Sequence, residues 1–228
     1  MTPSSWPAAA GALPGWTFRA ARPDDAAACA PLILASGVQE FGFFLGAPPE
    51  AITDFLRATF TSPYGRFSWR RHRVAVAPDG TVAGVLAIHD GRAIALDDPH
   101  VAWRLVRHVG LAHTVPALLR GLVLESELPA PKRHQILVAH CAIDPRWRGT
   151  GVFTALFGEA VASGALAVVP QGGASGGEAR DVVLDVLLSN PRAAALYRRL
   201  GFTEAPRAKP RSARLPPALA SVRMRWAP

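Results

Sequence analysis

The stretch at 135–162 constrains the fold most. An apolar run at 135–143 predicts a strand, a short loop with Gly149 and Gly151 follows, and apolar residues at helical spacing predict a helix over Val152–Ala162. A helix that begins directly after glycines exposes backbone N–H groups and a partial positive charge, and the glycines let an anion approach the backbone. The sequence therefore predicts a strand–loop–helix unit suited to a diphosphate. A tight turn that binds no ligand is the alternative.

The rest of the chain alternates between strand and helix patterns. Strands are expected at 16–20, 67–77, 81–90, 182–188, near 202 and at 220–226, and helices at 24–37, 48–60 and 191–200. The apolar pattern at 99–127, broken by Gly110 and Pro116, predicts an inserted pair of helices. A glycine-rich stretch at 171–178 predicts a flexible loop. The order is mixed α/β.

The composition fits one globular domain in a reducing compartment. The chain has 228 residues, 50% of them hydrophobic, and its two cysteines, Cys29 and Cys141, have no metal-type spacing. We expect a disordered lead-in at 1–14 and a single domain at 15–228. No apolar run is long enough to cross a bilayer, and none precedes Arg19, the first positive side chain. The expected location is therefore the cytoplasm, without a membrane partner.

The positive charge lies in one part of the chain. The net charge is +8, and the segment 192–225 carries nine basic residues against Glu204 alone. A phosphate-bearing ligand, a nucleic acid or a solvated surface would each explain this basic C-terminal segment, which we place at 204–228 with the last strand. No aromatic interleaving or nucleic-acid motif accompanies the charge, so we rank nucleic acid last. The oligomeric state stays open, a homodimer included.

Other phosphate and metal chemistries fit the sequence poorly. Neither Gly-x-x-x-x-Gly-Lys-Ser/Thr nor Gly-x-Gly-x-x-Gly occurs, which argues against kinases and dehydrogenases. The histidines of the insert, His100, His108 and His113, do not share one helical face in a ligand pattern, so no metal site is expected.

Two sequence blocks resemble the Gcn5-related N-acetyltransferases (the GNAT family). The first, Asp144-Pro-Arg-Trp-Arg148-Gly-Thr-Gly151, has the context and spacing of the loop that holds the acetyl-CoA diphosphate in that family. The second, from Asn190 to Phe202, matches Asn-x-x-Ala-x-x-Leu-Tyr-x-x-x-Gly-Phe. The resemblance implies an α/β (α+β) fold: a mixed, mostly antiparallel central sheet with splayed central strands and flanking helices. The helical insert is an addition to it.

The resemblance also implies acetyl-CoA, or another acyl-CoA, and direct acetyl transfer to a primary amine. The acceptor would be a small molecule, an amino acid or a protein N-terminus. The positions that it places against the cofactor, the first three as backbone contacts, are Cys141, Ala142, Ile143, Arg148, Gly149, Thr150, Gly151, Val152, Phe153, Asn190 and Tyr197. Phe153 departs from the family's small residue, and its ring either crowds the diphosphate or points into the core. A catalytically weak acyl-CoA-binding sensor or interaction module is the alternative function.

Three residues are candidates for proton transfer. Tyr197 matches the tyrosine that many members use as general acid toward the thiolate. Asp185 lies where related enzymes carry a glutamate base, and an acid in an apolar strand requires a cleft or an ion pair with a nearby arginine. His140 is the rival base, or a satisfied core histidine; strand alternation places it opposite Ile143 unless a β-bulge reverses this. Glu125 and Glu127, at the end of the insert, are reserve candidates for the base, supported only by their position.

Overall fold

Seven strands form one sheet in the order β1-β2-β3-β4-β5-β7-β6. The computed structural model describes residues 13–166, 180–206 and 211–227, with the backbone alone at 94–98. The lead-in expected at 1–14 lies almost wholly outside these ranges, and the loop expected at 171–178 lies wholly outside them. The strands are β1 (Thr17–Ala20), β2 (His72–Val76), β3 (Val82–Asp90), β4 (Gln135–Ile143), β5 (Asp181–Leu187), β6 (Phe202–Glu204) and β7 (Ser221–Trp226).

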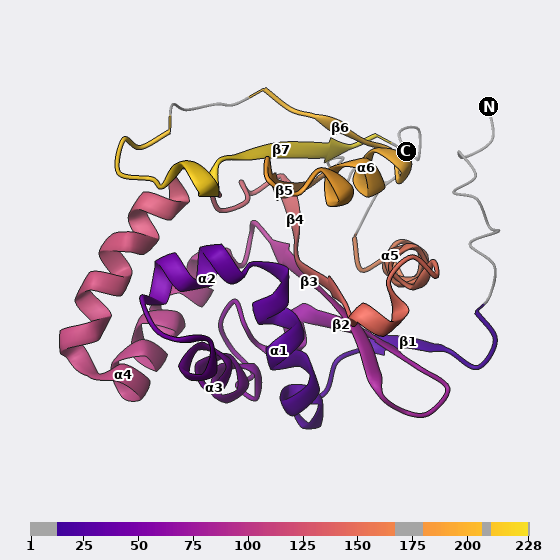
Figure 1. The fold of residues 1–228 in the computed structure, drawn as a ribbon, viewed down its shortest axis with the longest axis horizontal. Helices are drawn as coiled ribbons and strands as arrows, with labels where there is room; N and C mark the ends of the chain where they lie inside the picture. The colour runs from indigo at the N-terminus through magenta and orange to yellow at the C-terminus, as the bar shows by residue number, and fades with distance from the viewer. Residues whose placement is uncertain (1–12, 167–179, 207–210, 228) are drawn as a thin grey trace.

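Neighbouring strands are antiparallel except β4 and β5, which are parallel. The predicted mixed, mostly antiparallel sheet is therefore confirmed. The helices that cover it are α1 (Ala26–Ser36), α2 (Val38–Leu45), α3 (Pro49–Phe60), α4 (Ile94–Glu125), α5 (Val152–Ala162) and α6 (Pro191–Arg199). In Figure 1, α4 and α5 lie at opposite ends of the molecule, and β6, β7 and α6 lie together along one side.

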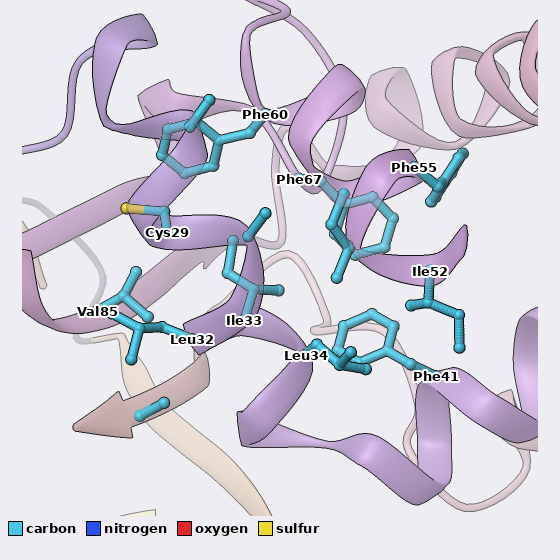
Figure 2. Packing of buried hydrophobic residues seen from close by; sticks show 14 of the residues in the cluster. Cys29, Leu32, Ile33, Leu34, Phe41, Ile52, Phe55, Phe60, Phe67 and Val85 are labelled. Atoms are coloured by element: carbon cyan, nitrogen blue, oxygen red, sulfur yellow. The ribbon is translucent and has the colours of Figure 1, made fainter. Parts of the chain in front are cut away.

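The helices pack on both faces of the sheet because successive side chains on a strand point in opposite directions. Val74 and Val85 pack against α1 and α3, whereas the next residues, Ala75 and Leu86, pack against α5. Figure 2 shows the cluster on the α1 face, where phenylalanine rings from three segments meet around Ile33. Each such fully buried side chain contributes about 1.5–3 kcal/mol by leaving water.

The sequence pattern does not predict α2. This helix of eight residues follows Gly37 and contains Gly42, and glycine disfavours helices. Helix α2 forms because Phe41 is buried in the α1-face cluster, and it ends at Gly46, whose φ of 62° is left-handed. Among the described helices none alone is long and apolar enough to cross a membrane. The segments Pro23–Ser36 and Val38–Leu45 reach that length only as a pair, bent by 95°.

Helix α4 consists of two helical segments, as the sequence predicts for the insert. They join at Gly110, whose φ of 74° and ψ of 168° are not helical. The helix begins at Ile94, earlier than expected, and Pro116 lies inside it without ending it. Arg120, in the second segment, donates hydrogen bonds to the carbonyls of Phe44 and Leu45. This segment is therefore held against the end of α2.

Candidate functional site

The centre of the sheet opens between β4 and β5. The two strands pair only from Gln135 to Leu137 on β4 and from Asp181 to Val183 on β5. Beyond this point β4 continues to Ile143 beside β3 alone, so backbone groups on its β5 side have no strand partner. The splay that the sequence resemblance implies for the central strands is present.

A β-bulge in β4 lies at this opening. Ala87 of β3 faces Ala139 and Val85 faces Ala142, so one residue of β3, Leu86, faces two residues of β4. His140 has a φ of 50°, the only positive φ of a non-glycine residue in the described chain. The bulge lies beside the cavity described below, which Ala139 and His140 both line. His140 contacts the α1-face cluster whereas Ile143 packs toward α5, so the two lie on opposite faces, as predicted.

The glycine loop has the conformation that an anion-binding loop needs. Gly149 and Gly151 have φ of 80° and 87°, and a Cβ atom on either would meet no atom within 4 Å. The side chains of this loop turn back toward the protein. Thr150 donates from its hydroxyl to the Trp147 carbonyl at 2.7 Å, and Arg148 donates from Nε to the Ile143 carbonyl at 3.0 Å. The outer side of the loop therefore consists of backbone.

The first turn of α5 carries no side-chain cap. Gly151 is its N-cap residue and has no side chain to bond the N–H groups that follow it. Asn190 differs, because its side chain accepts a hydrogen bond from the Ala193 N–H and caps α6 at 3.1 Å. The structure thus gives Asn190 a helix-capping contact, whereas the start of α5 offers unbonded donors to a ligand.

Phe153 points into the core, which decides between the two sequence alternatives. Its side chain is buried with Leu184, Tyr197 and Phe202, and its neighbour Val152 is buried against the strands on the α5 face. The ring is therefore directed away from the outer side of the glycine loop. The departure from the small residue usual in the GNAT family does not crowd the place where a diphosphate would lie.

Tyr197 meets β4 at the bulge. The thiol of Cys141 donates a weak hydrogen bond to the Ala139 carbonyl at 3.6 Å, and the Tyr197 hydroxyl lies near enough to this thiol to affect its ionisation. Burial raises the pKa of Tyr197 well above its ordinary value, and Cys141 raises it further. Burial also raises the pKa of Cys141 to about 12, although the neighbouring Tyr197 hydroxyl opposes this. Both groups are therefore protonated at neutral pH.

A cavity of about 420 Å³ lies on the α1 face of the splay. Its wall is largely apolar, with rings of Phe41, Phe44 and Phe67 and leucines of α4. The ionisable side chains that line it are Glu40, Arg66, His89, Glu125, His140 and Asp185. Burial raises the pKa of Glu40, and among the described residues no cation pairs with it. The cavity therefore combines an apolar wall with one half-buried carboxylate that has no counter-ion.

Asp185 lines the cavity but is held by an arginine. Its two carboxylate oxygens accept hydrogen bonds from Nε and Nη2 of Arg223 on β7, at 2.9 and 2.7 Å. Both side chains are largely buried, at 9% and 17% exposure. The ion pair with a nearby arginine, one of the two explanations for this acid in an apolar strand, is present.

The two reserve carboxylates differ. Glu125 lines the cavity, whereas the fully buried side chain of Glu127 accepts hydrogen bonds from Arg211 and from the Ser221 N–H. These bonds attach the segment before β7 to the end of α4, and that segment passes over α4 in Figure 1. The carboxylate of Glu127 is therefore engaged in structural contacts, whereas Glu125 faces the cavity.

Sequence reasoning missed two histidines that surround His140. His72 on β2 hydrogen-bonds His140 from Nε2 to Nδ1 at 3.0 Å, and its own Nδ1 lies 2.8 Å from the Ser68 carbonyl. His89 on β3 lies edge-on to His140, with ring centroids 5.5 Å apart, and its buried Nδ1 has no hydrogen-bond partner in the part of the chain that the structure describes. Burial lowers the pKa of all three histidines, that of His72 to about 4. Only the fold brings them together, since 68 residues separate His72 from His140.

The three rings do not form a metal site. Within the described ranges no group of three or more His, Cys, Asp or Glu side chains is arranged to hold a metal ion. In the insert, His100 and His108 instead lie against aromatic rings of Tyr64 and Phe55.

Solved structures share this fold. An N-acetyltransferase from Staphylococcus aureus Mu50 is 18% identical, with a TM-score of 0.64, over 92% of this chain and 98% of that one. A protein described as an acetyltransferase is 20% identical, with a TM-score of 0.61 and the same coverage. One from Corynebacterium glutamicum ATCC 13032, described as histone acetyltransferase HPA2 and related acetyltransferase, is 21% identical, with a TM-score of 0.56, over 94% and 97%.

No protein-family model and no curated protein matches the sequence. At these identities the structural likeness concerns the fold, and a fold alone does not establish an activity. The shared features are the mostly antiparallel sheet, its single parallel pair β4–β5 and the flanking helices. The chain therefore has the fold of the Gcn5-related N-acetyltransferases.

Proposed function

We propose that the chain is an acetyl-CoA-dependent N-acetyltransferase that acts on a small primary amine by direct transfer. The observation that carries the proposal is the splay of β4 from β5. At this one opening lie the uncapped glycine loop before α5, the hydroxyl of Tyr197 and a cavity lined by His140. A donor site, an acid and an acceptor site are thus adjacent.

The glycine loop fits the diphosphate of coenzyme A. Backbone N–H groups around Thr150 and at the start of α5 would bind it, because the open side of Gly149 and Gly151 admits a phosphate close to the main chain. Acetyl-CoA would supply the acetyl group as a thioester. The backbone of β4 at Cys141–Ile143, which has no strand partner on its β5 side, would hold the pantetheine arm along the splay, and an N–H there would polarise the carbonyl.

Tyr197 would act as the acid. It is neutral at physiological pH and lies at the β4 bulge, so it can donate a proton to the departing sulfur. Cysteine chemistry is disfavoured because the thiolate is the nucleophile, and burial raises the pKa of both Cys29 and Cys141 to about 12. This supports direct transfer from the thioester to the amine, without an acyl-cysteine.

His140 is better placed than Asp185 to act as the base. Burial lowers the pKa of His140, so at neutral pH the ring is neutral and one of its nitrogens carries a lone pair. Asp185 has both oxygens bound to Arg223. A general base of this kind contributes about 10²–10⁴-fold to the rate.

The cavity favours a compact amine with an apolar body. About 420 Å³ accommodates a small molecule, and the rings of Phe41, Phe44 and Phe67 suit an aromatic or branched aliphatic group. The carboxylate of Glu40 would attract the ammonium form of the amine into this apolar space. We therefore propose a cationic, monofunctional amine as the acceptor, in preference to a folded protein.

Two measurements test the proposed function. Isothermal titration should give tight binding of coenzyme A, and a thiol-release assay should give turnover with arylalkyl or branched alkyl amines. Glu40→Gln should raise KM for such amines about tenfold, equivalent to about 1.4 kcal/mol of binding, with KM for acetyl-CoA unchanged. Glu50→Gln, on an exposed face of α3, is the matched control and should change neither value. Absence of coenzyme A binding would refute the proposal.

One observation favours a second candidate, an acyl-CoA-binding module without turnover. Asp185, the carboxylate in the position of the family's base, is engaged by Arg223. This candidate predicts coenzyme A binding with no product from a broad panel of amines.

A further inference from the structure

Two successive hydrogen bonds join the Ser68 carbonyl, His72 and His140 in a chain. The carbonyl at one end determines which ring nitrogens carry a proton. The Ser68 carbonyl can only accept a hydrogen bond, so Nδ1 of His72, at 2.8 Å, must carry a proton. His72 is neutral, because burial lowers its pKa to about 4, and its Nε2 is therefore bare. The 3.0 Å contact with His140 then requires a proton on Nδ1 of His140. The two ring planes are inclined by only 12°, with centroids 5.2 Å apart.

The consequence falls on the other nitrogen of His140. A neutral imidazole with a proton on Nδ1 has a lone pair on Nε2. No described residue forms a hydrogen bond with this Nε2. The atom is also not fully buried. His140 lines the cavity, with its ring stacked on Phe67.

We propose that His72 is a positioning residue that fixes His140 in the Nδ1–H tautomer and so presents Nε2 to the acceptor cavity as a base. The role of Nε2 as a base rests on the proposed function, whereas the tautomer does not. In the reaction, the ammonium group of the acceptor loses a proton to Nε2 of His140, and the neutral nitrogen then forms a bond to the acetyl carbon. The carbon–sulfur bond breaks, the sulfur takes the proton of Tyr197, and the second proton of the nitrogen passes to the Tyr197 oxygen. His140 releases its proton to solvent, which returns both side chains to their starting forms.

Other charged and titratable groups also face this chain. His89 on β3 and Arg66, in the segment before β2, both lower the pKa of His140. Arg71 lowers the pKa of His89, which burial and His72 lower more strongly. Across the cavity the ionisable groups are Glu40 of α2, Glu125 of α4 and Asp185 of β5. None of these makes a hydrogen bond with His140, so the tautomer depends on His72 and the Ser68 carbonyl.

The tautomer can be measured without any turnover. Nitrogen-15 shifts of the ring atoms, in the full chain at neutral pH and assigned with His140→Asn, should show a protonated Nδ1 and a bare Nε2 for His140. In His72→Leu, which removes the acceptor, the Nε2–H form should appear. A wild-type chain with His140 in the Nε2–H form would overturn the inference. If the expected tautomer occurs in a chain without turnover, the proposed function fails while the positioning contact stands.

Activity of two matched variants gives the second readout. His72→Leu should lower kcat on the order of 10²-fold, with KM for the amine and for acetyl-CoA unchanged. His72→Gln should keep most of the turnover, because its side-chain carbonyl can accept the bond from Nδ1 of His140 in place of Nε2. Equal losses in both variants, with both chains folded by circular dichroism, would contradict the positioning role.

Discussion

The ring of Phe153 lies edge-on against that of Tyr197, with centroids 6.0 Å apart and planes inclined by 66°. This contact links the first turn of α5 to α6, and so joins the glycine loop to the proposed acid. Aromatic pairs in this arrangement contribute about 0.5–1.5 kcal/mol beyond the area that they bury. A small residue at this position would leave the Tyr197 ring without the contact. The departure from the family pattern thus supports the site.

Tyr197→Phe should abolish most of the turnover while leaving the chain folded. The ring keeps its contacts with Phe153 and Phe202, and only the hydroxyl near Cys141 is lost. We expect kcat to fall by about 10²-fold or more, with Kd for coenzyme A unchanged. Tyr64, which is exposed and does not line the cavity, is the other tyrosine of the chain, and Tyr64→Phe should retain full activity. A Tyr197→Phe enzyme with normal kcat would exclude the acid role.

Gly151→Ala should weaken coenzyme A binding more than it weakens the fold. Its φ of 87° disfavours a Cβ by about 1–2 kcal/mol, and that Cβ would project into the open side of the loop. Gly80, in the turn between β2 and β3, has a φ of 83° and the same open surroundings, so Gly80→Ala should cost similar stability. Calorimetry should show an increase of Kd by at least about tenfold for Gly151→Ala alone. Equal Kd values in both variants would argue against a diphosphate at this loop.

The histidine cluster should make the fold sensitive to mild acid. Burial depresses the pKa of His72 from 6.5 to about 4, so the unfolded chain binds a proton first as the pH falls. The stability from this group is therefore complete above pH 6.5 and is lost between pH 6.5 and 4. The loss is about 2 kcal/mol at pH 5 and about 3 kcal/mol when complete. His89 and His140 shift in the same direction and add to it.

Urea denaturation at a series of pH values measures this effect. His72→Gln should flatten the dependence of the unfolding free energy on pH between 7 and 5, whatever its stability at neutral pH. The exposed His113 is the control, and His113→Gln should keep the wild-type slope. An unchanged slope in His72→Gln would show that His72 is not buried in its neutral form.

Asp185→Ala should destabilise the chain, and Asp185→Asn should keep turnover. Removing the carboxylate leaves the largely buried guanidinium of Arg223 without its partner, at a cost of about 3 kcal/mol in the unfolding free energy. Asp54→Ala removes a similar pair with Arg57, but both side chains are half exposed, so the cost should stay below about 1 kcal/mol. Loss of kcat in a stable Asp185→Asn enzyme would instead identify Asp185 as the base.

Local patterns sufficed for β4 and α5, whose bounds agree with the sequence expectation, because each has strong apolar periodicity and clear ends. They failed for α2, whose stability comes from the burial of Phe41 and not from helix propensity. The bulge at His140 also escaped prediction, since it depends on the register between β3 and β4. His72 became visible as a neighbour only once β2 and β4 were placed in one sheet.

The break at Gly110 divides α4 into two segments that differ in what they contact. The second segment, which walls the cavity with Leu118, Gly121 and Leu122, contributes no strand to the sheet; Arg120 bonds it to α2, and the residues at its end bond the segment before β7. Lengthening that segment by one helical turn would shift its end by about 5.4 Å while the sheet stays intact. A change confined to this segment would therefore reshape one wall of the cavity and leave β4, β5 and α5 as they are.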